Sequence, residues 1–336
     1  MRALCIAQAS VALGRLSRAV GWQGQRRWLG ERRWQEDSER GNRSLSAAKK
    51  RKRRVAIAAD LTNSELLYGI QPVEAALRQQ RRALYGLYIP AAYEGDLPRD
   101  RLENITKLAQ ELNLPVARVP MGDLTKAAGG VAHQGVILKA GRFNPPRVTK
   151  IREFVGNEYS VGVLGSPDVV HQPRRRLPLW VALDGIQDPH NLGSIVRSAV
   201  FFGADAVLTP ASGVCQVMPV VSKSSSGAAE CAAIYRASNI AVVLERARID
   251  GWSIVCAIAS STPTSKPISS NEVPRLTRPT ILVIGSEQSG VSDSIAALSD
   301  MNVEIPACAG LPPFIDSLNA GVAAGILLAS LKFEGE

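Results

Sequence analysis

The sequence predicts an α/β protein in which a mainly parallel sheet follows a smaller α/β domain. From about residue 179 onward, apolar runs with strand character alternate with segments of helical periodicity. A shorter alternation of the same kind occupies residues 66–141. Polar loops follow several predicted strands of the second region, where parallel sheets bind ligands. We therefore expect two folded domains, 66–141 and 179–336, joined by a linker over 142–178.

The positive charge of the chain is concentrated at its beginning. Residues 1–54 contain 15 lysines and arginines against 4 acidic residues, whereas the remainder contains 25 basic and 26 acidic residues. The folded body is therefore close to neutral. An RNA-binding surface on it would have to come from local clustering and not from bulk charge.

The N-terminal arm, residues 1–54, has the composition of a mitochondrial targeting sequence. Residues 1–30 contain five arginines and no acidic residue, and their apolar residues have a loosely amphipathic spacing. That composition is typical of a presequence, so we expect import into the mitochondrial matrix. The basic run Lys49–Arg54 leaves a nuclear address, an RNA-binding tail or a solvated linker open.

Metal and membrane sites are not indicated. The five cysteines are scattered and show no metal-ligand spacing, so we expect reduced thiols and no metal. No apolar run reaches the roughly 20 residues needed to cross a bilayer. The longest such run, 320–331, predicts a buried helix instead.

The first domain is expected to begin near Leu66 and to open with a helix over 68–78, in which Pro72 suits the first turn. His133 precedes its last strand without an acidic or cysteine partner nearby. A structural or RNA-contacting role is therefore favoured over a catalytic one for His133. The remaining expected elements are strands at 84–89, 116–119 and 136–139 and helices at 104–112 and 123–128.

The segment 142–178 is predicted to be a long linker, because it is rich in proline and has few periodic apolar positions. Arg174–Arg176 forms a modest basic patch within it.

The second domain begins with a predicted strand at 180–184 and a helix at 191–202, for which Asn191 is the expected N-cap and Gly203 the stop. The small, polar segment 222–230 is expected to let a ligand approach the backbone closely. Further expected elements are strands at 205–209, 253–257, 281–284 and 302–305 and helices at 240–250, 292–299 and 318–331.

Three loops at strand ends carry the candidate chemistry: 184–191, 285–290 and 306–319. Gly285 and Gly290 have the spacing of a phosphate-binding P-loop, but Val291 stands where that loop needs lysine. The loop therefore argues against an ATPase. No GxGxxG follows a strand, so a dinucleotide site is unsupported as well.

These loops resemble the three motifs of the SpoU (TrmH-like) branch of the SPOUT RNA 2′-O-ribose methyltransferases. The matching runs are Leu183–Gly193 with Arg197–Ala199, Gly285–Gly290, and Ile305–Asn319. The first domain, with Tyr68-Gly69-Ile70 and His133-Gln134-Gly135, is similar to the ribosomal-protein-like RNA-binding domain that precedes many members. The resemblance covers roughly 66–332 and is nearest to mitochondrial members that modify large-subunit ribosomal RNA.

Two departures from the family pattern stand out. Gln288 occupies a position where the family usually has glycine, and the loop between Ile305 and Ser317 is longer than in the simplest members. Glu287, the functional acid of this loop, is intact.

The resemblance implies a trefoil-knotted domain that binds S-adenosylmethionine and works as a homodimer. By position, Gly285, Ile305 and Leu318 should line the cofactor. The small residues Ala320, Gly321, Ala324 and Gly325 would permit close helix approach at a dimer interface or within one subunit. The polar motif positions, expected to be catalytic, are Arg197, Asn191, Glu287, Ser317 and Asn319.

Arg197 takes the central role in that expectation. Because a guanidinium has a pKa above about 12, it is a poor general base. We expect Arg197 to hold a phosphate and stabilise the developing alkoxide, with the proton leaving to phosphate or water. Glu287 could orient Arg197 or Asn191, and Asn319 could fix its loop.

The expected function is therefore S-adenosylmethionine-dependent guanosine-2′-O-methylation of mitochondrial large-subunit rRNA. One alternative is a tRNA 2′-O-methyltransferase of the same family, against which the first domain weighs. The other is a non-enzymatic RNA-binding ribosome-assembly factor, against which the intact Arg197, Glu287 and Asn319 weigh.

Overall fold

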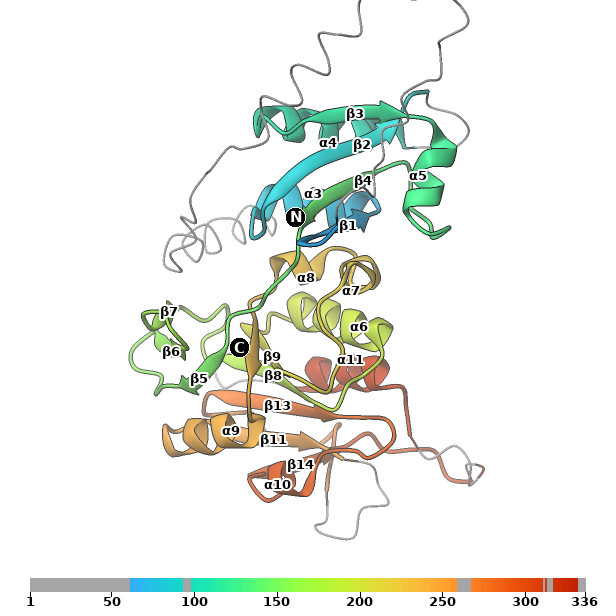
Figure 1. The fold of residues 1–336 in the computed structure, drawn as a ribbon. Coiled ribbons are helices and arrows are strands. Elements are labelled where there is room, and N and C mark those ends of the chain that lie inside the picture. Colours follow the sequence, from blue (N-terminus) through green and yellow to red (C-terminus); the bar gives the residue numbers. More distant parts are fainter. Residues whose placement is uncertain (1–60, 93–97, 259–266, 311, 313–316, 332–336) are drawn as a thin grey trace, which may run out of the picture.

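The structure is a computed structural model that describes residues 61–92, 98–258, 267–310, 312 and 317–331. The predicted targeting arm, 1–54, lies outside the described residues, as does part of the third loop. A small α/β domain sits above a larger α/β domain, and the two are in contact (Figure 1).

A seven-stranded sheet forms the larger domain, in the order β10-β9-β8-β13-β11-β14-β12, and all its pairings are parallel. The expected parallel α/β fold is thereby confirmed. Its strands are β8 (Leu179–Asp184), β9 (Ala206–Pro210), β10 (Ile234–Ala237), β11 (Ser253–Ala257), β12 (Ile268–Ser269), β13 (Thr280–Gly285) and β14 (Met301–Glu304).

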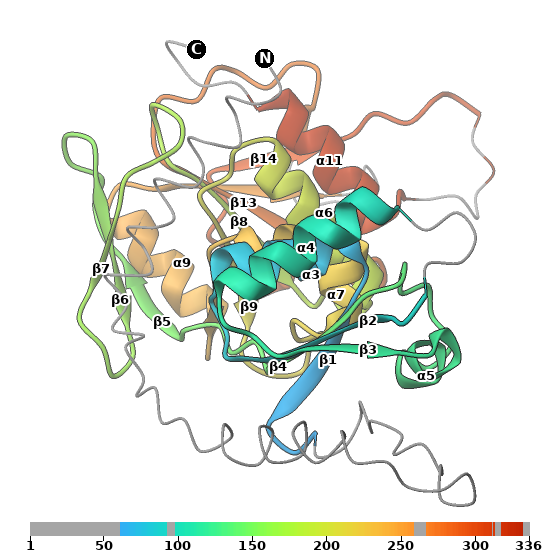
Figure 2. The same ribbon diagram turned by 90° about the horizontal axis from the view of Figure 1, so that it is seen from above.

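One face of this sheet is covered by four helices. They are α6 (Pro189–Phe201), α7 (Pro219–Ser224), α8 (Ala228–Cys231) and α11 (Ala320–Ser330). Their buried side chains, among them Ile195, Val221 and Leu327, share one apolar cluster with strand residues such as Val181. Helices α6 and α11 lie side by side, which places two of the candidate loops at neighbouring helix starts (Figures 1 and 2).

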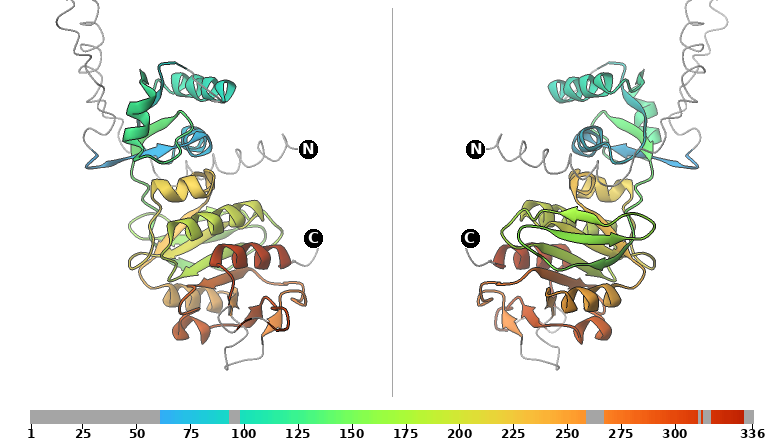
Figure 3. Two further views of the ribbon diagram at one scale, coloured as in Figure 1. Left: turned by 90° about the vertical axis from the view of Figure 1, so that its right-hand side faces the viewer. Right: turned by 90° about the vertical axis from the view of Figure 1, so that its left-hand side faces the viewer.

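The opposite face is covered by α9 (Ile240–Ile249), α10 (Asp293–Ala296) and a second, antiparallel sheet of β5 (Val148–Ile151), β6 (Tyr159–Val163) and β7 (Val169–His171). The right-hand panel of Figure 3 shows these three strands in front of the larger sheet. The expectation of an irregular linker over 142–178 is therefore wrong. The strands were missed because they are only three to five residues long and are separated by glycine-containing turns.

An aromatic group binds this small sheet to the larger one. The Trp180 ring stacks on Tyr235 with centroids 5.3 Å apart, and its Nε1 donates to the Tyr159 hydroxyl at 2.8 Å. Trp252 meets Tyr159 edge-on and donates to the Arg152 carbonyl at 2.9 Å. Both tryptophans are fully buried, so residues 148–171 belong to the core of the larger domain.

The first domain is a four-stranded sheet in the order β1-β4-β2-β3, in which only β2 and β3 run parallel. Its elements are β1 (Ser64–Tyr68), α3 (Ile70–Gln79), β2 (Leu84–Pro90), α4 (Arg99–Glu111), β3 (Val116–Val119), α5 (Met121–Ala127) and β4 (Ile137–Gly141). The predicted helix over 68–78 thus begins later, after an edge strand that the sequence did not reveal. Gly69 separates the two at φ 95°, a conformation that favours glycine.

The two domains meet through residues 219–231, which comprise α7, a turn and α8, and which we call the docking segment. Glu230 Oε1 accepts hydrogen bonds from Arg82 Nη2 at 2.9 Å and from Ser222 Oγ at 2.6 Å. The side chains of Glu230 and Arg82 are each 1% exposed. Arg82 also pairs with Glu65, whose pKa is raised because burial outweighs the attraction of Arg82.

Close backbone approach completes the contact. A Cβ at Gly227 would lie 2.7 Å from the Gln71 carbonyl oxygen, so only glycine fits there. Lys223 Nζ donates to Gln134 Oε1 at 2.9 Å across the same junction. The small polar residues of 222–230 therefore serve domain contact, a role that was not expected from the sequence.

Candidate functional site

A cluster of polar side chains centres on Glu287, in the loop after β13. Its Oε1 accepts from Asn191 Nδ2 at 2.9 Å, from Asn319 Nδ2 at 2.8 Å and from the Ala320 backbone N–H at 3.0 Å. Asn319 Nδ2 also donates to Asn191 Oδ1 at 2.8 Å. One carboxylate thus brings together the three loops predicted from the sequence. We call these groups the Glu287 cluster.

Asn191 reaches the cluster from the first turn of α6. The helix begins earlier than expected, at Pro189, and its N-cap is Asp188, whose Oδ1 accepts from the His190 N–H at 3.0 Å. The expectation that Asn191 caps the helix is therefore wrong. Asn191 is 7% exposed, and its amide is turned to Glu287 and Asn319.

Asn319 does cap a helix. Its Oδ1 accepts from the N–H groups of Gly321 at 3.0 Å and Val322 at 3.3 Å, which fixes the start of α11. Since the oxygen is engaged there, the amide nitrogen must point to Asn191 and Glu287. The orientation of this side chain is thus determined by the helix backbone.

The glycine at 285 is required by the loop that follows it. A Cβ there would lie 2.1 Å from the Gly290 carbonyl carbon, because Ser286 and Gly290 close the loop with two backbone hydrogen bonds. Asp184 Oδ2 secures its far end by accepting from the Ser292 N–H at 2.7 Å. The close approach expected of Gly285 is made, within the described residues, by its own loop.

Arg197 is exposed on α6, six residues after Asn191, or about 9 Å along the axis. Its Nη1 donates to Ser226 Oγ at 3.1 Å, in the turn of the docking segment. Of the two roles considered for Glu287, orientation of Asn191 is the one observed. Ser226 was not singled out from the sequence. Nothing in a run of three serines marks which one meets an arginine on another helix.

Of the residues expected to line a cofactor, Leu318 directly precedes a member of the Glu287 cluster in the sequence, and Ile305 follows another strand of the same sheet. Ile305 directly follows β14 and packs at the border of the apolar cluster that includes Ala320. Leu318 is 47% exposed, an unusual position for leucine, and Ser317 beside it is also exposed. Both precede Asn319, so their backbone is held close to Glu287.

The small residues of α11 pack within the subunit. A Cβ at Gly321 would lie 2.0 Å from Ser194 Oγ on α6, and one at Gly325 would lie 3.6 Å from Ser198 Oγ. Ala320 and Ala324 are buried in the apolar cluster. The helix is also less buried than predicted, since Val322 and Ile326 are 52% and 38% exposed.

His133 has a structural environment. Its Nδ1 accepts from the Gly135 N–H at 3.2 Å, its Nε2 lies 3.1 Å from Thr125 Oγ1, and burial lowers its pKa. Among the described residues, no group of three or more potential metal ligands is found. Nor does any helix within them have the length and apolar character to span a membrane.

The comparisons with known proteins agree with this arrangement. Residues 178–329 match the SpoU rRNA Methylase family, and residues 66–146 match the RNA 2′-O ribose methyltransferase substrate binding family. The chain is 35% identical to rRNA methyltransferase 1, mitochondrial, of Homo sapiens, over 80% of this chain and 72% of that one. With the protein of the same name in Schizosaccharomyces pombe it is 30% identical, over 80% and 90%.

Solved structures share the fold. An AdoMet-bound rRNA methyltransferase from Sinorhizobium meliloti matches with a TM-score of 0.58 at 21% identity, covering 80% of this chain and 87% of that one. The SpoU methyltransferase AviRb from Streptomyces viridochromogenes, in complex with AdoMet, matches with a TM-score of 0.56 at 19% identity, covering 80% and 89%. On this evidence, the chain belongs to the SpoU rRNA methylase family.

Proposed function

We propose that the chain is an S-adenosylmethionine-dependent 2′-O-ribose methyltransferase that modifies guanosine in the large-subunit rRNA of mitochondria. The observation that carries the proposal is the Glu287 cluster, in which one carboxylate orients Asn191 and Asn319 beside the helix that bears Arg197. The cluster joins all three predicted motif loops at the carboxyl edge of the sheet, which is where parallel α/β sheets bind ligands.

The residues around the cluster fit the cofactor. Leu318 offers an apolar side chain that is half exposed, and Ile305 borders the apolar core. The loop that follows Gly285, closed by Ser286 and Gly290, is exposed at the same edge. Gly285, Ile305 and Leu318 would hold S-adenosylmethionine, which supplies an electrophilic methyl group when bound.

Arg197 is the group that acts on the nucleophile. A ribose 2′-oxygen forms a bond to the methyl carbon while the carbon–sulfur bond breaks, and the hydroxyl proton leaves to phosphate or water. The guanidinium holds the neighbouring phosphate and stabilises the negative charge that develops on the oxygen. Asn191, Glu287, Ser317 and Asn319 position the loops around the reacting atoms.

The relatives support the finer parts of the proposal. The named human and yeast relatives are mitochondrial rRNA methyltransferases, which favours mitochondria over other compartments and rRNA over tRNA. A transit peptide within residues 1–54 and passage to the matrix belong to the same proposal. So does a trefoil knot formed by the chain beyond β13, as the family resemblance implies.

A homodimer is also proposed, but on a different surface from the small residues named above. Val322 and Ile326 on α11 and Phe201 on the neighbouring α6 are exposed at 52%, 38% and 81%. An exposed apolar group on two adjacent helices is typical of a protein–protein contact.

The test is a map of ribose methylation across all RNAs in cells with the wild-type chain, with Arg197→Ala, or with neither. We expect one position in mitochondrial large-subunit rRNA to lose its methyl group in the last two. Calorimetry should show that the purified Arg197→Ala protein still binds S-adenosylmethionine within a few-fold. Full methylation by Arg197→Ala would contradict the catalytic role, and methylation confined to tRNA would contradict the substrate.

A further inference from the structure

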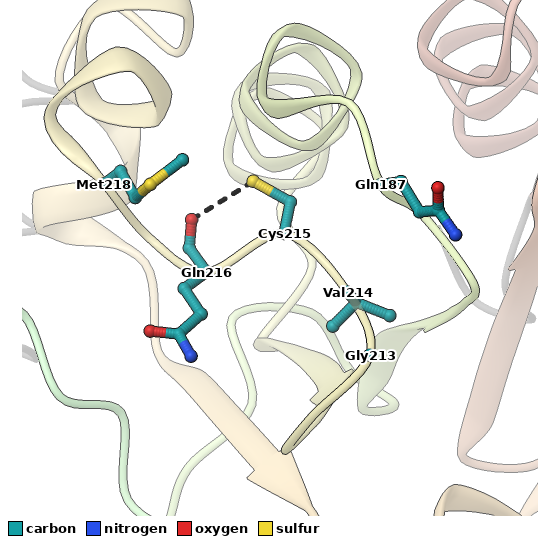
Figure 4. A pocket seen from close by; sticks show the side chains of 6 residues that line it. All are labelled: Gln187, Gly213, Val214, Cys215, Gln216 and Met218. Carbon is teal, nitrogen blue, oxygen red and sulfur yellow. Dashed lines mark hydrogen bonds between the residues drawn. The ribbon is translucent and has the colours of Figure 1, made fainter.

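A hollow of about 420 Å³ lies at the carboxyl edge of the sheet, where the loops after the adjacent strands β8 and β9 face one another. Gln187 contributes from the first loop, and the second contributes a continuous stretch (Figure 4). The lining residues are Gln187, Gly213, Val214, Cys215, Gln216 and Met218.

The backbone around this hollow is anchored. The Cys215 N–H donates to the Ile186 carbonyl at 3.2 Å, which ties the two loops together. Ile186 and Val217 point into the core and are 5% and 6% exposed. The side chains left facing outward are those of Gln187, Gln216 and Met218, of which Met218 is 43% exposed. The hollow is therefore an open depression between two loops that a backbone hydrogen bond joins.

The chemistry of the lining favours a neutral, planar ligand with a hydrogen-bonding edge. Two primary amides, Gln187 and Gln216, can each donate and accept, whereas Val214 and Met218 offer apolar surface. Burial, with the charge of Asp188, raises the pKa of the Cys215 thiol, so this group is uncharged. Since no side chain of the lining is cationic and Asp188 is close, a phosphate is disfavoured. A nucleobase has the matching properties.

The position of the hollow relates it to the reacting groups. Gln187 precedes Asn191 of the Glu287 cluster by four residues. On the other side, Met218 is the N-cap of α7, which leads to Ser226 and its hydrogen bond with Arg197. The hollow is thus adjacent in sequence to both polar groups of the site, and its lining does not include Gly285, Ile305 or Leu318.

We propose that this hollow receives the base of the nucleotide whose ribose is methylated, turned out of its stack, with Met218 against its face and the amides of Gln187 and Gln216 at its edge. The inference rests on the proposed function. Holding the base outside its stack would fix the ribose 2′-hydroxyl in front of the methyl donor, and enzymes that do chemistry on a base hold the extruded base in a pocket.

The experiment uses the full chain and two synthetic RNAs that contain the mapped target. One carries the natural nucleotide, and the other an abasic ribonucleotide that retains the 2′-hydroxyl. Single-turnover methylation is measured for wild type, Met218→Ala and Gln187→Ala. Ile249→Ala is the control, because Ile249 is exposed on α9 at the opposite face of the sheet.

On the natural RNA, Met218→Ala should lower the single-turnover rate constant about two- to tenfold, the range expected when an aromatic ring loses a methionine contact, and Gln187→Ala should lower it less. On the abasic RNA, wild type should be slowed to the same extent, and neither variant should slow it further. Affinity for S-adenosylmethionine should be unchanged throughout.

Three results would overturn the inference: equal losses by the variants on both RNAs, wild-type activity of both variants on the natural RNA, or weaker cofactor binding by the variants. The last result would assign the hollow to the cofactor. Failure of the proposed function looks different, because wild type would then methylate neither RNA or Arg197→Ala would be fully active.

Discussion

The domain junction and the Glu287 cluster are each centred on one glutamate, but the first glutamate is buried and the second is exposed. Glu230, at the domain junction, is 1% exposed and receives the charged Arg82. Glu287 is exposed and receives the neutral amides of Asn191 and Asn319 and the Ala320 N–H. Loss of one partner from a buried ion pair leaves an uncompensated charge, whereas an exposed carboxylate is readily solvated. We therefore expect Glu230 to contribute mainly to the free energy of unfolding, and Glu287 mainly to the positions of the side chains in the site.

The largest effect on stability is expected from Glu230→Ala. It removes one of the two carboxylates paired with the buried Arg82, which keeps Glu65, and it leaves the Ser222 hydroxyl without its acceptor. The free energy of unfolding should therefore fall by about 1.5–3 kcal/mol, and the domain contact should weaken. Urea denaturation of the full chain, compared with the exposed control Glu158→Ala, measures the change. A loss below about 1 kcal/mol would remove the distinction between the two glutamates.

The converse case is Arg197→Lys, which should cost activity but not stability. Lysine keeps the charge but lacks the planar fork that binds a phosphate through two donors. We expect the single-turnover methylation rate to fall roughly 100- to 1,000-fold, which corresponds to an activation free energy higher by about 2.7–4 kcal/mol. The free energy of unfolding should not change. Arg278→Lys, another exposed arginine, is the control. A near-normal rate would show that charge alone suffices.

Glu287→Gln tests whether Glu287 serves mainly to orient Asn191 and Asn319 and contributes little to stability. Glutamine lacks the charge that strengthens all three hydrogen bonds to Oε1. The rate of methyl transfer should fall roughly ten- to hundredfold, which corresponds to an activation free energy higher by about 1.5–3 kcal/mol. Unfolding should change less than in Glu230→Ala. Equal destabilisation by the two substitutions, measured in the same denaturant series, is the outcome that contradicts us.

A smaller effect is expected from Ser226→Gly, because Ser226 belongs to both regions. Its φ is 52°, which glycine adopts more easily, so stability should stay constant or rise by up to about 1 kcal/mol. Arg197 loses its hydrogen bond, so kcat should fall by about 1 kcal/mol, roughly fivefold, with KM unchanged. A combined loss of stability and rate would indicate a merely structural serine.

The smallest effect concerns Glu65, the second partner of Arg82. Burial raises its pKa above the ordinary 4.5, so the folded chain binds its proton more tightly than the unfolded chain. Its stabilising contribution is therefore present below 4.5 and is lost as pH rises through the folded pKa. Relative to Glu65→Gln, wild type should lose unfolding free energy as pH increases to 7. A gain with pH would contradict this sign.

Much of the larger domain could be predicted because its strands are apolar runs and its helices follow them at short intervals. Ser253–Ala257 was predicted without error, and most other strands to within two residues. The three site loops followed from their positions at strand ends. The short strands β5–β7 could not be predicted in this way, since so few residues establish no period.

The roles of individual side chains were predicted less well than the loops in which they lie. Asn191 was assigned to capping because a helix start and an asparagine coincide, but Asp188, three residues earlier, takes that role. The segment 222–230 was expected to let a ligand approach the backbone, and Gly321 to permit close helix approach at a dimer interface or within one subunit. Gly227 of that segment meets α3, and Gly321 meets α6 within the subunit. Such contacts depend on the tertiary fold and leave no local signal.

The aromatic group around Trp180 has a practical consequence for spectroscopy. Of the five tryptophans, three lie in the arm and the other two are Trp180 and Trp252, while residues 66–178 contain none. A chain without its first 54 residues would therefore emit tryptophan fluorescence only from the core of the larger domain. Trp180 stacks on Tyr235 at 5.3 Å and loses that neighbour on unfolding. Its emission should shift to longer wavelength when this core unfolds, and should not change when the first domain alone unfolds.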